Sequence, residues 1–528
     1  MKDSSVHFPT WLLLALAGPI ASPLFAQVED IGADSSFGFF ISGDGQTGYG
    51  QLSAPGGVVE PHRWTSIGGI EQLANPFPFI GTANAISDDG SVVIGFSYDG
   101  PIGPGEPRAL LWDAAGVATE LTPPGSVASD AFQMSGDGLA YAGIYREAPT
   151  NWHACVWDAA GVLTDIHPAF GGSFSTVIDM SHDGSTVLGR TTDPAGDTRN
   201  FIWRASTGSV ELLPSSAGQV FPSSITADGS AIAGRISLPN LNDSGIFYWS
   251  AATGYVVSDP SVGEPTQASI SNDGSRVYGL VDLNTLDNSA AIFTWTPAGG
   301  FQFDDPNMQL TLAAGSFDGS VLVGSMGGSG FDKQAYRWTS ATSFVPLASN
   351  GLASFASSVS LDGTVATGAL LESPSDRRAV IWSESGVIGA NYCGPAVPNS
   401  SGAAAEIRLG GSNITSVGAL DLTASDLPVN TFGFFIASSD QGFVPMPAGS
   451  FGNLCLSGSI ARLDNPGQIF QSGAMGTATV TIDPISFDGP AGPILPPFGE
   501  RWYFQAWFRD ANPNVSSNFT DGATVPLF

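Results

Sequence analysis

Lysine is almost absent from this sequence of 528 residues, which contains only Lys2 and Lys333. Lysine and arginine together number 17 against 48 aspartates and glutamates, which gives a formal net charge of −31 at pH 7. So few cations cannot form a basic patch able to hold a phosphate backbone or an anionic membrane surface. The composition therefore argues against nucleic acid as a partner and against electrostatic attachment to a membrane.

Long apolar runs are also missing. The run at residues 11–16 is far shorter than the ~20 residues that span a bilayer, and no later segment is a candidate span. Lys2 precedes this run, Gly18 and Pro19 break it, and small residues lead to Ala26, which is typical of a secretory signal. We predict a signal peptide at residues 1–26, no membrane span, and a secreted chain that is extracellular or at the cell surface.

Cysteine is scarce, with only Cys155, Cys393 and Cys455, and no Cys-x-x-Cys pair supports a zinc or redox motif. Exported proteins keep disulfides. Cys393 and Cys455 both lie in the last 140 residues and are the natural partners, so we predict a disulfide between them. Cys155 lies in an apolar run and is expected to be a free, buried residue.

Catalytic constellations are rare. Beyond the signal segment the histidines are His62, His153, His167 and His182, and residues 391–528 contain none. A histidine-based triad or metal site confined to that region is therefore excluded. There is no Gly-rich phosphate loop, and no metal, cofactor or catalytic residue is implied. No spacing in the sequence supports a catalytic dyad of His153 with Asp165 or Asp183. A pair of carboxylates for glycoside hydrolysis is not excluded, because aspartate and glutamate are plentiful.

Glycine (67) and proline (37) are abundant, hydrophobic residues make up 42% of the chain, and charged residues make up only 12%. The chain is too apolar to be disordered and too rich in helix breakers to be mostly helical. Its length suggests two to four domains at roughly 100–200 residues each.

A four-residue turn with Asp-Gly at its end recurs eight times, 44 to 48 residues apart. Its aspartates are Asp44, Asp89, Asp137, Asp183, Asp228, Asp273, Asp318 and Asp362. A tryptophan keeps nearly the same period at Trp64, Trp112, Trp157, Trp203, Trp249, Trp295, Trp338 and Trp382. Two independent marks with one period indicate a repeat architecture.

Each unit can be read as four short strands. In residues 176–213, strands 176–180 and 186–189 flank the Asp183-Gly184 turn, and strands 201–203 and 210–213 flank the turn at Gly208. A single four-stranded meander cannot bury both faces, but eight around an axis can. We predict an all-β fold with an eight-bladed β-propeller at residues 27–390; seven blades and a linear β-solenoid are the alternatives. Residues 28–31 match a fourth-strand position and are expected to pair with the last unit.

The units resemble the HAF-type extracellular repeat of secreted bacterial proteins. His153-Ala154-Cys155-Val156-Trp157 is the nearest copy, and the segments ending at Trp338 and Trp382 are looser copies without the histidine. The resemblance covers about residues 28–390. It implies a propeller-like extracellular module and says little about activity.

The period stops after Trp382, and residues 391–528 read as further short strands. These are 405–409, 420–424, 432–437, 453–459, 476–482 and 502–509, which suggests a C-terminal β-sandwich domain. Segments 392–395, 452–456, 502–510 and 517–522 resemble a C-terminal domain of secreted planctomycete and myxobacterial proteins. The resemblance implies a secreted bacterial setting and no particular chemistry.

The repeated residues have a structural interpretation. One aspartate per turn followed directly by glycine lacks the alternating oxygen ligands of a calcium loop and the extra residue of a sialidase Asp-box, so we interpret these turns as structural. The tryptophans are expected to pack within the blades.

One strand in the C-terminal region is a candidate ligand contact. Alternation over 502–509 places Tyr503, Gln505, Trp507 and Arg509 on one face, and the more apolar Trp502, Phe504, Ala506 and Phe508 on the other. The first face mixes rings with polar groups, as in a platform on which a glycan stacks. The alternative interpretation is an amphipathic strand covered by a loop or by the propeller. Tyr503, Trp507 and Arg509 are the residues to test.

Our functional hypothesis is an exported, non-enzymatic propeller protein that binds or scaffolds at the cell exterior, with an extracellular glycan or protein as partner. The rival is a polysaccharide-acting hydrolase or lyase with carboxylates in the propeller channel. Variable loops on a rigid scaffold commonly carry binding, so we also hypothesise that ligands dock on the face formed by loops 74–84, 98–108, 167–175, 191–200 and 237–245.

Overall fold

The structure is a computed structural model of the 528-residue chain. It describes residues 28–527 except 54–58, 67, 78, 102–104, 148–150, 214–217, 239–242, 259–262, 283–288, 297–298, 305–307, 329–331, 350, 374–375, 384–387, 412, 414–419, 485–486, 490–491, 497–499 and 512–515. The signal segment predicted at 1–26 lies outside the described residues. Among the described residues, no helix has the length and apolarity needed to cross a membrane.

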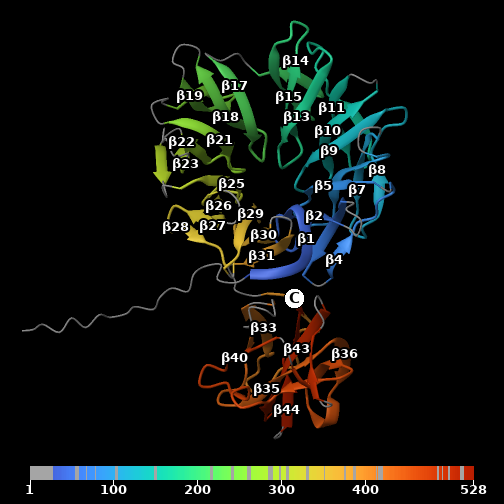
Figure 1. The fold of residues 1–528 in the computed structure, drawn as a ribbon, viewed down its shortest axis with the longest axis vertical. Helices are drawn as coiled ribbons and strands as arrows, with labels where there is room; N and C mark the ends of the chain where they lie inside the picture. Colours follow the sequence, from blue (N-terminus) through green and yellow to red (C-terminus); the bar gives the residue numbers. More distant parts are fainter. Residues whose placement is uncertain are drawn as a thin grey trace, which may run out of the picture.

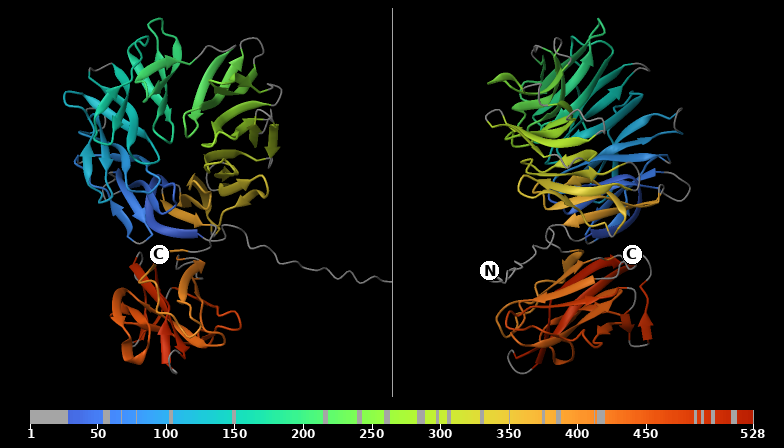
Figure 2. Two further views of the ribbon diagram at one scale, coloured as in Figure 1. Left: turned by 180° about the vertical axis from the view of Figure 1, so that it is seen from behind. Right: turned by 60° about the vertical axis from the view of Figure 1, so that its left-hand side comes forward.

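The molecule is all-β, and residues 28–383 form a propeller-like ring of antiparallel sheets, most of them four-stranded. The sheets follow one another around the ring in sequence order, from β1 back to β31, as Figure 1 shows. Residues 388–527, which we call the C-terminal unit, lie outside the ring below β1 and β31 in Figures 1 and 2. The two parts are therefore built side by side rather than interleaved.

The strands of the first half of the ring alternate with the turns identified in the sequence. They are β1 (Val28–Ile41), β2 (Thr47–Ser53), β3 (Val59–Thr65), β4 (Gly69–Gln72); β5 (Gly81–Ile86), β6 (Val93–Tyr98), β7 (Pro107–Trp112), β8 (Ala118–Glu120); β9 (Ala128–Met134), β10 (Ala140–Arg146), β11 (Trp152–Asp158), β12 (Leu163–Asp165); β13 (Phe174–Met180), β14 (Thr186–Thr192), β15 (Thr198–Arg204) and β16 (Ser209–Leu212). A single parallel bridge between Trp152 and Phe174 joins the sheets of β9–β12 and β13–β16.

The second half continues the same pattern. Its strands are β17 (Gln219–Ile225), β18 (Ala231–Leu238), β19 (Asp243–Ser250), β20 (Gly254–Val257); β21 (Glu264–Ile270), β22 (Val277–Asp282), β23 (Ala290–Thr296), β24 (Gly300–Asp304); β25 (Leu310–Gly315), β26 (Val321–Met326), β27 (Gln334–Thr339), β28 (Ser343–Pro346); β29 (Ala353–Val359), β30 (Val365–Ser373) and β31 (Asp376–Ser383). Each Asp-Gly turn joins the first two strands of a sheet, as the sequence predicted.

The long strand β1 closes the ring. Its first residues pair antiparallel with β31, with Val28 opposite Trp382, and its last residues pair with β2, with Ile41 opposite Gly48. The expected pairing of residues 28–31 beside the last unit is therefore present. Because one continuous strand belongs to two sheets, the first and last sheets are held together by backbone hydrogen bonds.

A second closure runs around the axis through the turns themselves. The amide of Asp88 donates to the carbonyl of Gly136 at 2.8 Å, and the amide of Gly136 donates to that of His182 at 2.7 Å. Equivalent bonds, each from the amide of the first residue to the carbonyl of the second, link the remaining turns. They are Asp183–Ala227, Ala227–Asn272, Asn272–Phe317, Phe317–Leu361, Leu361–Gly43 and Asp44–Asp88. Each turn is thus bonded to the next, and the series returns to its start. We call the end of the ring that carries these turns the turn face.

The eight tryptophans of the repeat are all buried, as expected for packing residues. Several also bond to the neighbouring sheet. The indole N–H groups of Trp112, Trp157 and Trp382 donate to the carbonyls of Ala74, Leu121 and Ala348 at 2.6, 2.9 and 2.6 Å. Each of these carbonyls ends the preceding sheet, so these tryptophans fasten one sheet to the next as well as filling the core.

The C-terminal unit has two main sheets and two hairpins. One sheet contains β32 (Ala390–Tyr392), β35 (Phe432–Ser438), β38 (Ala461–Leu463), β39 (Phe470–Gln471), β43 (Glu500–Asp510), β44 (Ser516–Phe519) and β45 (Gly522–Leu527); the other contains β33 (Glu406–Gly411), β34 (Leu420–Ser425) and β40 (Ala478–Ile482). The hairpins are β36 (Asp440–Pro445) with β37 (Asn453–Ser457), and β41 (Phe487–Gly489) with β42 (Gly492–Ile494); a 3-10 turn covers Pro447–Gly449. One apolar cluster holds residues of both sheets, among them Ile407, Leu422 and Phe504.

The predicted strands of this unit are present, but the prediction missed several others, including β36, β38, β41 and β45. β38 and β41 have only three residues, too few to show alternation, and β36 and β45 contain proline, which disfavours a strand assignment.

The two parts contact each other at the closing strand. Asp30 exchanges two hydrogen bonds with Asn413, from its N–H to the Asn413 Oδ1 at 3.0 Å and from the Asn413 side-chain amide to its carbonyl at 2.9 Å. The amide of Gly389 donates to Glu29, and Arg501 donates to the carbonyl of Ser66 at 3.1 Å. The C-terminal unit therefore holds the strand that closes the ring.

Candidate functional site

The two faces of β43 differ as the sequence predicted. Trp502, Phe504 and Phe508 are buried in the core between the two sheets. Trp507 and Arg509 lie on the opposite face, where Trp507 is half-buried and Arg509 is exposed. This outer face carries the candidate ligand residues.

An aromatic row crosses the outer face. Phe434 on β35 is directly opposite Trp507 in the strand register, and the two rings are 4.9 Å apart with an interplanar angle of 31°. On the other side of β43, Phe519 of β44 pairs with Trp507. Three neighbouring strands thus place three rings side by side, an arrangement that strand pairing produces wherever aromatic residues share a register.

This row forms one wall of a pocket of about 1000 Å³. The turn at Pro447 and Ala448 and the adjoining hairpin form another part of its wall. The lining residues are Phe434, Ile436, Pro447, Ala448, Ser450, Leu454, Gly458, Ile460, Arg462, Asp464, Trp507, Ser517 and Phe519. The exposed lining of the pocket is about equally polar and apolar, so it offers both apolar contact and hydrogen bonds to a small molecule.

The wall formed by the turn has unusual backbone geometry. Met446 and Ala448 have φ values of 46° and 51°, in the left-handed region that residues other than glycine rarely occupy. The segment is tied to β44, because the hydroxyls of Ser450 and Ser517 are 2.8 Å apart and the amide of Phe451 donates to the carbonyl of Ser517 at 2.9 Å. Such backbone positions cluster at sites that hold ligands.

Two guanidinium groups flank the pocket wall. The guanidinium carbon of Arg462 lies 6.0 Å from the centre of the Phe434 ring. That of Arg509 lies 5.5 Å from the Trp507 ring and 5.7 Å from the ring of Phe432. Cation–π contacts of this kind hold a guanidinium beside a ring while leaving its N–H groups available to a ligand.

Of the three predicted contact residues, Trp507 lines the pocket and Arg509 borders its aromatic wall, but Tyr503 does not line it. The Tyr503 ring packs edge-on against Tyr392 at 5.4 Å. Tyr503 is therefore described better by the alternative interpretation, in which another part of the chain, here Tyr392, covers the strand position. The sequence did not single out Phe434, Arg462 or Phe519, because they come from other strands whose order it does not reveal.

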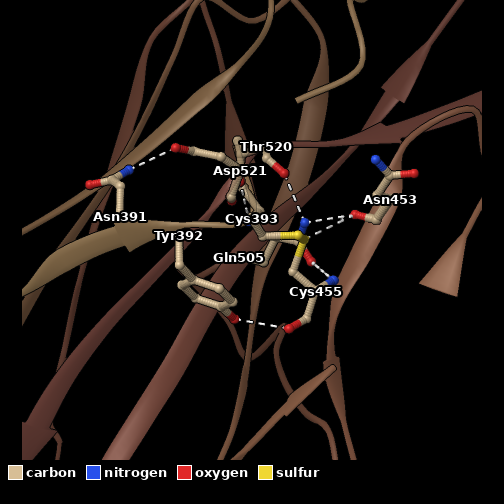
Figure 3. Close-up of a disulfide and its surroundings, with 9 residues drawn as sticks. Asn391, Tyr392, Cys393, Asn453, Cys455, Gln505, Thr520 and Asp521 are labelled. Carbon is tan, nitrogen blue, oxygen red and sulfur yellow. Dashed lines mark hydrogen bonds between the residues drawn. A yellow bond between two sulfur atoms is a disulfide. The ribbon is translucent and has the colours of Figure 1, made fainter. Parts of the chain in front are cut away.

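Gln505 is fully buried next to the disulfide and has a structural role. Its side chain accepts a hydrogen bond from the amide of Cys455 at 3.0 Å and donates to the carbonyls of Asn453 and Thr520 at 2.8 Å (Figure 3). The expected disulfide between Cys393 and Cys455 is formed, and Cys155 is free and buried. Tyr392 donates to the carbonyl of Cys455 at 3.0 Å, so this corner is held by covalent and polar contacts.

A second hollow, of about 520 Å³, lies at the turn face. It is lined by Asp88, Asp89, Gly136, Asp137, His182 and Asp183. His182 Nε2 lies 2.7 Å from the Asp88 carboxylate, and this hydrogen bond raises the pKa of the histidine. A side chain at Gly136 would collide with both groups, which explains glycine at this position.

The turn aspartates bordering this hollow use their carboxylates within the turns. In Asp89, Oδ1 accepts hydrogen bonds from the amide of Ser91 at 2.9 Å and the hydroxyl of Ser87 at 2.7 Å, and these bonds lower the pKa of the carboxyl. Asp137 accepts from Ser135 and Leu139 in the same way. The contacts are those of a turn, and among the described residues no group of three or more His, Cys, Asp or Glu side chains is arranged to hold a metal ion.

The structure also brings together side chains for which the sequence offered no supporting spacing. His153 Nδ1 lies 3.2 Å from the carboxylate of Asp165, which also accepts from the Tyr145 hydroxyl at 3.0 Å. The His153 ring stacks on His167 at 4.1 Å. The hydroxyl of the nearby Ser175 accepts a hydrogen bond from the amide of Ala154. The hydroxyls of Ser129 and Ser354 accept equivalent bonds from the amides of Ala109 and Ala335 in other sheets. This recurrence indicates a structural serine rather than a nucleophile.

Comparison with protein-family models gives no match, and comparison with curated proteins gives none either. The resemblance to the HAF-type repeat therefore stays a prediction from the residues. Among solved structures, the chain is similar to dipeptidyl peptidase 4 of Porphyromonas gingivalis, with 10% identity, a TM-score of 0.48, and coverage of 76% of this chain and 65% of that one. It is also similar to the β-propeller domain of the Trilobed protease from Pyrococcus furiosus, with 11% identity, a TM-score of 0.41, and coverage of 60% and 96%. The propeller of Dos1 gives 12% identity, a TM-score of 0.43, and coverage of 69% and 95%.

Proposed function

We propose that this protein is an exported binding protein without enzymatic activity, and that the pocket of its C-terminal unit binds an extracellular glycan. In this proposal residues 27–390 form an eight-bladed propeller that acts as a rigid support, and residues 391–528 form a β-sandwich that carries the pocket. The observation that carries the proposal is the aromatic row of Phe434, Trp507 and Phe519 in a pocket of about 1000 Å³.

The eight-bladed interpretation is supported by the two closures of the ring. The series of backbone bonds through the turns passes through all eight Asp-Gly turns and returns to Gly43. Strand β1 supplies the fourth strand beside β31 and the first strand before β2. A seven-bladed ring would have to leave one of these turns outside the bonded series.

Glycan as ligand follows from the composition of the pocket. The carbon-bound hydrogens of a pyranose ring form an apolar face that packs on an aromatic ring, and its hydroxyls need polar partners at the edge. The aromatic row supplies the first, and Arg462, Asp464 and the hydroxyls of Ser450 and Ser517 supply the second. Polar groups placed beside apolar surface fix the orientation of a ligand in this manner.

Export is supported by the N-terminal pattern of the sequence and by the disulfide between Cys393 and Cys455, since disulfides persist in oxidising compartments. Both are consistent with a protein that acts outside the cell or on its surface.

The test is a glycan array combined with a panel of polysaccharides, in which binding and cleavage are scored on the same purified protein. We expect binding without cleavage. Trp507→Leu keeps apolar volume in the pocket wall but removes the ring face, so it should reduce binding by at least tenfold, whereas Trp507→Phe should retain most of it.

Phe221→Ala is the matched control, because Phe221 is an exposed aromatic residue on β17 of the ring. It should leave binding unchanged. Binding that survives Trp507→Leu but is lost in this control would place the ligand on the ring and refute the proposed site.

The rival function, a polysaccharide-acting hydrolase or lyase, is favoured by one observation, the hollow at the turn face with the Asp88–His182 pair. There His182 would act as the general acid and Asp88 would hold it. The same panel decides between the functions: cleavage that His182→Gln abolishes, while Trp507→Leu does not, would favour the rival.

A further inference from the structure

We propose that the ligand of the C-terminal pocket is an anionic glycan, whose pyranose ring stacks on Trp507 and whose carboxylate or sulfate is bound by Arg462 and Arg509. This inference rests on the proposed function, because it names the class of glycan that the pocket would bind.

The first argument is the pairing of the arginines. The chain has 17 basic residues against 48 acidic ones, so carboxylates far outnumber the cations that could pair with them. Arginines that do so include Arg63, Arg108, Arg146, Arg199, Arg378 and Arg408. Within the described part of the chain, the ion pairs of 4 Å or less include neither Arg462 nor Arg509. Other described arginines are also absent from these ion pairs, among them Arg190, Arg204, Arg235, Arg276 and Arg501. What distinguishes Arg462 and Arg509 is that both guanidiniums lie against the rings of one pocket wall, where they can bind an external anion.

The second argument is the position of the two groups. Arg462 lies over Phe434 and Arg509 lies over Trp507, and these two rings are themselves paired across β35 and β43. The guanidiniums therefore border the same aromatic wall. A guanidinium presents its N–H groups as a planar fork that matches the oxygens of a carboxylate or sulfate, and charge-assisted bonds of this kind are stronger than neutral ones.

The pocket also contains one carboxylate, Asp464, two residues from Arg462 on the same edge. Its carboxylate accepts hydrogen bonds from sugar hydroxyls, so it favours a ligand that carries hydroxyls as well as charge. A compact inorganic anion gains nothing from the aromatic row. The combination of rings, arginines and one acid thus suits a charged sugar better than a simple ion.

The experiment compares matched polymers by isothermal titration calorimetry with the whole protein. Polygalacturonate is paired with its methyl-esterified form, which keeps the ring and removes the charge, and dextran sulfate is paired with dextran. We expect at least tenfold tighter binding of one charged polymer than of its neutral partner at low salt, with the difference falling as salt rises. A charge preference in the polygalacturonate pair identifies carboxylate as the recognised group, and a preference in the dextran pair identifies sulfate.

Arg462→Gln with Arg509→Gln should abolish the preference for the charged polymer, so that charged and neutral polymers bind with equal affinity; binding of the neutral polymer should weaken only by the hydroxyl contacts that Arg462 supplies. Arg408→Gln is the control, because Arg408 is exposed on β33 of the other sheet. Circular dichroism and thermal melting check that the variants fold.

Three outcomes would contradict the inference, and each has a different meaning. Equal binding of charged and neutral polymers through Trp507 would overturn the anionic class and leave glycan binding intact. Binding of polyglutamate with the same dependence on Trp507 and both arginines, and of no polysaccharide, would overturn the glycan and point to an acidic peptide. No binding of any of these polymers by the folded protein would overturn the anionic class, whereas the proposed function fails only if the glycan array also shows no binding.

Discussion

The ring and the C-terminal unit are built by different means from similar strands. In the ring, one turn, one tryptophan and one axial hydrogen bond are repeated from sheet to sheet. In the C-terminal unit each contact occurs once: a disulfide, a buried glutamine beside it, and a strained turn over a pocket.

The difference bears on where function can be recognised. In a repeated structure, packing explains a residue that recurs at the same position of every unit. Only a residue that differs from its counterparts, such as His182, is a candidate for function. In the C-terminal unit no residue has a counterpart, so a functional side chain must be recognised from its surroundings, as Trp507 is from the pocket. Four predictions test this contrast between repeated and single contacts.

The largest effect is expected from truncating a repeated tryptophan. Trp157 is fully buried and its indole donates to the carbonyl of Leu121 at 2.9 Å. Trp157→Ala should cost about 5 kcal/mol, because it leaves a cavity and removes the donor of a buried carbonyl. Urea unfolding measures this cost. A decrease in the free energy of unfolding of less than about 2 kcal/mol would show that the neighbouring sheets rearrange to fill the cavity.

The disulfide is the counterpart in the C-terminal unit. Cys393 and Cys455 are 62 residues apart in sequence, and their link should stabilise the unit by about 4 kcal/mol in the chain-entropy model. Cys393→Ala with Cys455→Ala should therefore make this unit sensitive to limited proteolysis while fragments of the ring stay intact. Cys155→Ala is the control. Equal sensitivity of both parts in the double variant would show that loss of the disulfide also destabilises the ring, through the junction between the two parts.

The contact between the two parts should depend on pH. Glu29 is 5% exposed, and burial raises the pKa of its carboxyl to about 7, against ~4.3 in an unfolded chain. Between these values the folded state binds more protons than the unfolded state. The stability from this group is therefore complete below about pH 4 and is lost as the pH rises through about 7.

Glu29→Gln should reduce the loss of stability between pH 5 and pH 8 by up to about 3 kcal/mol, at 1.36 kcal/mol per pKa unit. Melting temperatures at the two pH values measure it, with Glu211→Gln on β16 as the exposed control. An unchanged pH dependence would show that Glu29 reaches solvent when the junction opens.

The smallest effect is expected at a single repeated turn. Asp362 accepts hydrogen bonds from the hydroxyl of Ser360 at 2.6 Å and the amide of Thr364 at 3.0 Å. Asp362→Ala should cost about 1 kcal/mol, and Asp362→Asn should cost less because it keeps an acceptor. A cost of several kcal/mol would mean that the bonded series around the axis fails when one turn is changed.

Much of the ring could be predicted from sequence because its information is local. The Asp-Gly turns, the strands on either side and the spacing of the tryptophans all follow from residues within one unit. The closing role of residues 28–31 was also predicted, since they match the fourth strand of other units. The bond between Asp88 and His182 could not be predicted, because it joins two units across a glycine of a third.

The candidate site could be predicted only in part, for the same reason. Alternation along β43 placed Trp507 and Arg509 on the outer face, and the same alternation within residues 432–437 places Phe434 and Ile436 on one face. That β35 lies beside β43, and that β38 brings Arg462 to its edge, depends on pairing between distant segments. Alternation also placed Tyr503 on this face, but it could not show that the Tyr503 ring packs against Tyr392, because β32 is distant in sequence.

The sequence by itself determined the all-β class, the repeat period, the partners of the disulfide and the two faces of β43, because each depends on residue type and spacing. Only the tertiary structure decided which strands are neighbours, and therefore that three rings and two arginines border one pocket. Strand order is a property of distant hydrogen bonds, and no local pattern of side chains records it.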